Sequence, residues 1–117
     1  MDTQIDTKYD RKIDSFVVRM PGFISLNALK TWKKEFLATL SQINDHDKKG
    51  VLIDTNNHQF ESVECLKYLR ELFSEPQIKR SISRFAFVSP GRYRKPEIID
   101  YSEGYFLSFE EAYRWLS

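Results

Sequence analysis

The sequence predicts an α/β fold built on a mixed, mostly parallel sheet of about five strands. Two observations carry this prediction. Short runs rich in β-branched and aromatic residues alternate with longer segments whose apolar residues recur every three or four positions, the spacing of an amphipathic helix. The central run at 51–54 begins with three consecutive apolar residues, as expected for a strand covered on both faces. Helical crossovers between such strands are right-handed in nearly all cases.

The first part of the chain predicts a β-hairpin followed by a long helix. Strands are expected near residues 4–9 and 13–20, because apolar residues alternate in both runs and a short polar turn separates them. The Pro-Gly pair at 21–22 ends the second strand. Ser25 is expected to cap a helix over residues 26–43, because its hydroxyl can accept a hydrogen bond from a free amide in the first turn.

The middle of the chain predicts a helix between two strands. After the strand at 51–54, Ser62 opens a helix over 62–74 that Pro76 ends. The next strand is expected at 84–88, where Phe85 and Phe87 share one face. Residues 90–104 are expected to form a loop.

The carboxyl-terminal part predicts a short strand near 104–107 and a helix over 109–116. Ser108 is the expected cap of this helix, and Glu111 stands three residues later, which is the pattern of a capping box.

Composition excludes several classes of function. A chain of 117 residues is expected to form one domain, residues 1–117. Its net charge of +1 provides no field that would attract nucleic acid or an anionic membrane. The single cysteine, Cys65, rules out an internal disulfide and fits a reducing compartment. No run is long and apolar enough to span a membrane, and the first residues carry no signal-peptide pattern. We therefore expect a cytoplasmic protein with no nucleic-acid partner and no membrane span.

The order of these elements resembles that of the STAS-like, or SpoIIAA-like, family. The similarity runs from about Tyr9 to Leu116. It includes the strand VLID, the late strand SRFAFVSP and the ending FLSFEEAYRWL, in which a phenylalanine, acidic residues, an alanine and a Trp-Leu pair follow one another. The resemblance implies a small α/β domain related in shape to anti-sigma-factor antagonists and to CRAL-TRIO lipid-binding domains. It implies no common enzyme activity.

The polar turn after the central strand is the first candidate site. Open α/β sheets place ligands at the carboxyl ends of their parallel strands, where Asp54 stands. The candidate binding residues in this turn are Asp54, Thr55, Asn56, His58 and Ser62. Asp54 alternatively closes the turn by accepting hydrogen bonds from nearby amides. Sequence proximity alone does not align a carboxylate, an imidazole and a hydroxyl for catalysis.

The resemblance gives Ser62 a second interpretation. It lies near the position of a serine in anti-sigma-factor antagonists whose phosphorylation switches partner binding. In those proteins an Asp-Ser-Ser-Gly motif occupies this place, whereas here Glu61 replaces the aspartate, and Val63 and Glu64 replace the Ser-Gly pair. These departures argue against the switch and favour Ser62 as a helix cap.

The loop before the last strand is the second candidate site. Arg92, Tyr93 and Arg94 combine charge with aromatic surface, a mixture found at binding interfaces. The alternative is a solvated loop that prolines stiffen.

Two functions fit these features. The first is a non-enzymatic regulatory or protein-interaction module that binds a protein partner or forms a homodimer. The second is a carrier that holds a small apolar or anionic ligand between the sheet and a helix. No metal site and no cofactor are expected, because the histidines lack ligand spacing and the glycines form no phosphate loop.

Overall fold

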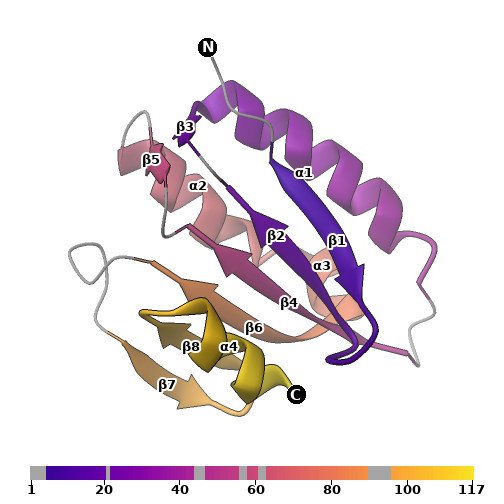
Figure 1. Ribbon diagram of the computed structural model, residues 1–117. Coiled ribbons are helices and arrows are strands. Elements are labelled where there is room, and N and C mark those ends of the chain that lie inside the picture. The colour runs from indigo at the N-terminus through magenta and orange to yellow at the C-terminus, as the bar shows by residue number, and fades with distance from the viewer. Residues whose placement is uncertain (1–4, 21, 44–46, 56–57, 61–62, 90–95) are drawn as a thin grey trace.

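The chain forms a six-stranded sheet with helices on both faces (Figure 1). The computed structural model describes residues 5–20, 22–43, 47–55, 58–60, 63–89 and 96–117. The strand order is β1-β2-β4-β6-β8-β7. These strands are β1 (Asp6–Asp10), β2 (Ser15–Arg19), β4 (Lys49–Asp54), β6 (Ile82–Val88), β7 (Glu97–Asp100) and β8 (Glu103–Phe106).

The four central strands are parallel, and each edge strand is antiparallel to its neighbour. β2, β4, β6 and β8 pair in parallel, while β1 pairs with β2, and β7 with β8, in the antiparallel sense. The prediction of a mixed and mostly parallel sheet is therefore confirmed.

Three helices cover one face of the sheet, and a fourth covers the other (Figure 1). The helices are α1 (Leu26–Leu40), α2 (Val63–Leu72), α3 (Pro76–Ser81) and α4 (Phe109–Leu116). Alternate residues of β2 and β4 pack under α1 and α2 in the larger core, whereas Val17 and Leu52 pack under α4. This division follows from strand geometry, because successive side chains point to opposite faces.

Local signals placed two helix starts correctly. The Ser25 hydroxyl accepts a hydrogen bond from the Ala28 amide at 3.1 Å. The Ser108 hydroxyl accepts one from the Glu111 amide at 3.3 Å and donates to the Glu111 carboxylate at 3.2 Å. The predicted caps are therefore confirmed.

Two helices end two or three residues earlier than the approximate predicted ends at 43 and 74. The first helix stops at Leu40 rather than 43, and the amides of Gln42 and Ile43 bond only three residues back. The second stops at Leu72, and Pro76 begins α3 instead of only ending its predecessor. Glu75 has an extended backbone because a residue before proline avoids the helical region, so the chain breaks and starts a new helix.

A second, two-stranded sheet was not predicted. β3 (Gly22–Ile24) pairs in parallel with β5 (His58–Phe60). This pair lies at the carboxyl ends of the central strands, next to the start of α2 (Figure 1).

Candidate functional site

Asp54 lies where the sequence predicted, at the carboxyl end of β4. Its neighbour across the ladder in β2 is Arg19. Strand alternation puts both side chains on the α4 face, and the Arg19 guanidinium lies 4.5 Å from the centre of the Phe109 ring. The Asp54 backbone continues the sheet, because its carbonyl accepts a hydrogen bond from the Met20 amide at 3.1 Å.

Thr55 has a structural role. It is fully buried, and its hydroxyl and its amide both donate to the Val88 carbonyl, at 2.7 and 2.9 Å. These bonds join the end of β4 to the end of β6. Because its hydroxyl is buried and engaged, Thr55 presents no hydroxyl to a ligand.

Several predicted site residues lie outside the described part of the chain. These are Asn56, Ser62, Arg92, Tyr93 and Arg94. The backbone of His58 belongs to β5 and pairs with Gly22, whereas the His58 side chain lies outside the described part of the structure.

Part of the second candidate segment forms an edge strand. A loop is predicted over 90–104, whereas residues 97–100 form β7, the outermost strand beside β8. Ile98 is 58% exposed, and Ile99 is 47% exposed. Tyr101, which follows the strand, is also exposed. The exposed apolar surface of this segment thus includes two isoleucines that were not among the predicted site residues.

A set of hydrogen bonds fixes the turn that ends β7. The Asp100 carboxylate accepts hydrogen bonds from the amide and hydroxyl of Ser102, both at 2.7 Å, and from the Glu103 amide at 3.1 Å. The hydrogen bond from the Ser102 hydroxyl lowers the pKa of Asp100 most, followed by that from the Ser102 amide. Asp100 is therefore ionised at neutral pH.

Arg84 anchors the same turn to the body of the protein. Its guanidinium lies 4.3 Å from the ring centre of Tyr101 and 4.1 Å from that of Trp115. Its Nε also donates to the Tyr101 carbonyl at 3.0 Å. Arginine favours such stacking, since its planar group can lie on aromatic faces while still donating hydrogen bonds. The turn after β7 is thus held against both β6 and α4.

The opposite edge of the sheet has a different surface. Strand β1 carries Asp6, Lys8 and Asp10 in alternation with Thr7 and Tyr9. Charged residues on an edge strand discourage further strand pairing. The two edges therefore differ in chemistry, and only β7 presents adjacent isoleucines.

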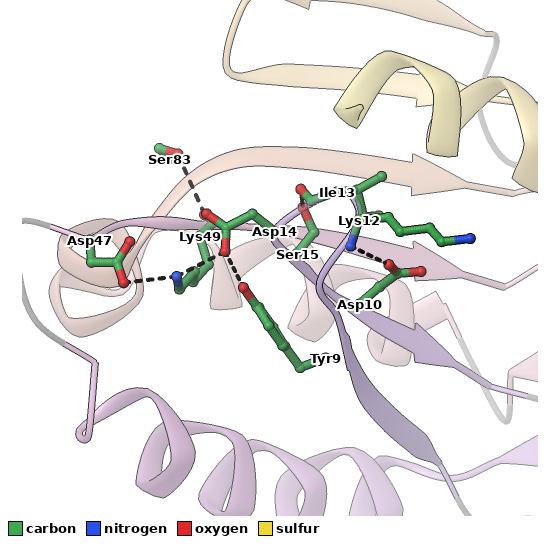
Figure 2. A network of polar contacts seen from close by, with 9 residues as sticks. All are labelled: Tyr9, Asp10, Lys12, Ile13, Asp14, Ser15, Asp47, Lys49 and Ser83. Carbon is green, nitrogen blue, oxygen red and sulfur yellow. Dashed lines mark hydrogen bonds and ion pairs between the residues drawn. The ribbon is translucent and has the colours of Figure 1, made fainter.

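A network of charged groups lies at the amino-terminal ends of the central strands, away from Asp54. Figure 2 shows Lys49 between two carboxylates, donating to Asp14 at 2.8 Å and to Asp47 at 2.9 Å. The Tyr9 hydroxyl also donates to Asp14. The hydrogen bond to Asp14, followed by that to Asp47, raises the pKa of Lys49 above its usual value. These contacts join the β1–β2 turn to the start of β4, so we assign the network a structural role.

Replacing Asp14 with asparagine is expected to lower the free energy of unfolding at neutral pH by less than about 1 kcal/mol, because solvent screens this half-exposed pair. Asparagine suits the position, where φ is 49°. Burial alone would raise the pKa of Asp14, but the hydrogen bonds from Lys49 and Tyr9 lower it below 3.8. The ionised Asp14 carboxylate therefore stabilises the folded state above pH 3.8. This stabilisation is lost as the pH falls through the depressed pKa of the folded state. Urea denaturation at pH 7 and pH 3 should show the variant's deficit shrinking at the lower pH. An equal deficit at both values would contradict this assignment.

The helices in the described part of the chain include none that is long and apolar enough to cross a membrane. Within the same residues, no three His, Cys, Asp or Glu side chains gather closely enough to hold a metal ion. Cys65 is fully buried in the larger core, as expected for a small apolar residue.

Comparison with known proteins identifies the fold. No protein-family model matches the sequence, and no curated protein matches it either. Among solved structures, the chain is similar to an uncharacterised protein of the DUF3478 family from Shewanella loihica PV-4, which has a SpoIIAA-like fold. The two chains share 14% sequence identity with a TM-score of 0.64, over 100% of this chain and 99% of the other. At this identity the likeness shows the fold alone. The chain has a SpoIIAA-like fold, as the resemblance in sequence predicted.

Proposed function

We propose that the protein is a cytoplasmic, non-enzymatic interaction module that binds an extended segment of a partner protein along β7. One observation carries the proposal. The outermost strand of the sheet presents two adjacent isoleucines to solvent, 58% and 47% exposed. Exposed apolar surface on an edge strand is a recognised site of strand pairing.

The backbone of β7 supports this mode of binding. Within the described residues, β7 pairs with β8 on one side and has no strand on the other. A strand with one unpaired side offers amides and carbonyls to an incoming segment, and pockets for alternate side chains then provide specificity. A register shift between Ile98 and Asp100 interrupts the regular alternation of β7, and both isoleucines are exposed there, so both would supply apolar contacts beside the added strand.

The charges that flank the isoleucines favour a different protein over a second copy of this chain. Glu97 precedes the isoleucines, and the ionised Asp100 follows them. An antiparallel pairing of two β7 strands centred between the isoleucines would place Glu97 of each copy opposite Asp100 of the other, and like charges directly opposite are destabilising. We therefore expect the partner segment to carry basic residues on either side of an apolar pair.

Two further observations support a non-enzymatic role. The Thr55 hydroxyl, which follows Asp54 in the candidate turn, is buried and donates to the Val88 carbonyl, so it is not available as a nucleophile. Moreover, the resemblance to anti-sigma-factor antagonists points to a class of protein that acts through protein partners.

Site-specific photo-crosslinking in the protein's own host tests the proposal. Ile99 is replaced by p-benzoyl-phenylalanine, and the matched control carries the same residue at Lys8, an exposed position on the opposite edge strand. We expect a discrete adduct with one other protein from position 99 and no such adduct from position 8. The proposal fails if position 99 gives no adduct, or gives the same adducts as position 8. An adduct of two copies of this chain would replace the proposed partner with a homodimer.

A further inference from the structure

A groove of about 560 Å³ opens on the face of the sheet covered by α1, α2 and α3. Its walls come from the end of α2, from α3, and from strands β6 and β8. The volume lies within the range of about 300–1,000 Å³ that is typical of small-molecule sites. This groove is separate from the exposed isoleucines of β7.

Four aromatic side chains line the groove. The ring centre of Phe73 lies 4.3 Å from that of Phe85 and 6.4 Å from that of Phe87, and Phe87 lies 6.0 Å from Tyr105. Phe73, Phe85 and Tyr105 are half-buried, so part of each ring remains accessible. Aromatic rings pack favourably against one another in offset or edge-to-face geometry. The lining therefore suits a flat apolar group.

The charges at the groove favour an anion. Arg70 and Lys79 both line it and are exposed, and neither has a carboxylate within 4.0 Å in the described part of the chain. Glu103 is the acidic residue of the lining, and its carboxylate already accepts a hydrogen bond from the Tyr105 hydroxyl. The groove thus combines two cations that lack such carboxylate partners with an aromatic surface. This combination is complementary to a molecule that carries an acidic group and a ring.

We propose that this groove binds a small organic anion with a flat aromatic body. The ring packs against Phe73, Phe85 and Tyr105, and the acidic group lies near Arg70 and Lys79. The proposal is independent of partner binding at β7, since it concerns different residues and applies to the isolated chain.

Titration of the purified full-length chain with 8-anilinonaphthalene-1-sulfonate tests the site. We expect saturable binding, with amide shifts in the NMR spectrum centred on Phe85 and Tyr105. The double variant Arg70→Gln with Lys79→Gln should weaken binding about tenfold, since it removes both charges that face the sulfonate. Arg70 and Lys79 are both exposed, so the double variant should fold.

Two controls make the result specific. The double variant Lys67→Gln with Arg80→Gln removes the same charge from the same two helices outside the groove lining, and it should leave binding unchanged. The uncharged probe N-phenyl-1-naphthylamine should bind both double variants equally. The proposal is overturned if the sulfonate shows no saturable binding, if the shifts centre elsewhere, or if both double variants weaken its binding equally.

Discussion

Replacing Phe36 with alanine is expected to lower the free energy of unfolding by about 3–5 kcal/mol. The side chain is only 2% exposed and lies in the larger core. Its ring stacks on Trp32 at 5.0 Å between centres and meets Phe16 edge-on at 5.7 Å. Truncation removes these contacts and leaves a cavity that the surrounding strands and helices can only partly fill. Small domains are stable by about 5–15 kcal/mol, so the variant should keep little of that margin.

The matched control for this variant is Phe23→Ala. Phe23 is the same residue type, but it is 41% exposed on β3. Its replacement should therefore cost only about 1–2 kcal/mol, because less apolar area leaves water on folding and no core cavity forms. Urea denaturation followed by circular dichroism measures both variants. Equal losses would contradict the assigned core.

Replacing Ile99 with lysine is expected to weaken binding of the cross-linked partner by about tenfold. Full burial of an isoleucine side chain contributes about 1.5–3 kcal/mol, so burying the exposed half of Ile99 contributes about 1 kcal/mol, and each 1.4 kcal/mol corresponds to a factor of ten in affinity. A lysine also adds a charge that would repel the basic residues expected in the partner. Folding stability should change by no more than about 0.5 kcal/mol, because the position is exposed. Isothermal titration with a peptide spanning the cross-linked partner segment measures the change in affinity.

Phe23→Lys is the control for this second variant. It also changes an exposed apolar residue to lysine, but on β3, beside the strand that carries His58. Its affinity for the partner peptide should match that of the unmodified chain. If Phe23→Lys abolishes binding while Ile99→Lys does not, the partner binds near the turn after β4 instead.

The elements that the sequence predicted well depend on local chemistry. Ser25 and Ser108 each cap a helix through a bond to an amide three residues later, so the signal and its effect lie in one short segment. The apolar alternation that predicted a strand over 13–20 is likewise local, and it recurs in β2, where Phe16 and Val18 enter the larger core.

The missed elements depend on contacts between distant segments. β7 forms only because β8 returns beside it, and β3 pairs with a strand that lies beyond α1 and β4. Two local features were consistent with the edge strand. Ile98 and Ile99 are β-branched residues, which favour strands, and Pro96 shortly before them is typical of a sheet edge.

In the candidate site, too, the features set by local sequence were predictable and those set by distant contacts were not. Asp54 could be placed at the end of a central strand because that strand was evident from its apolar run. The role of Thr55 could not, because its hydroxyl bonds to Val88 on a neighbouring strand. Similarly, no local pattern reveals that Arg84 lies between the rings of Tyr101 and Trp115.

Hydrogen–deuterium exchange of the chain with and without its cross-linked partner protein tests the central claim most directly. The β7 proposal predicts slower exchange at residues 97–100 in the complex, because an added strand bonds the amides that β8 leaves unpaired. Residues 6–10 of β1, on the other edge, should exchange at the same rate in both samples. Protection at β1, or at the β3–β5 pair, with no change at β7 would contradict the proposal.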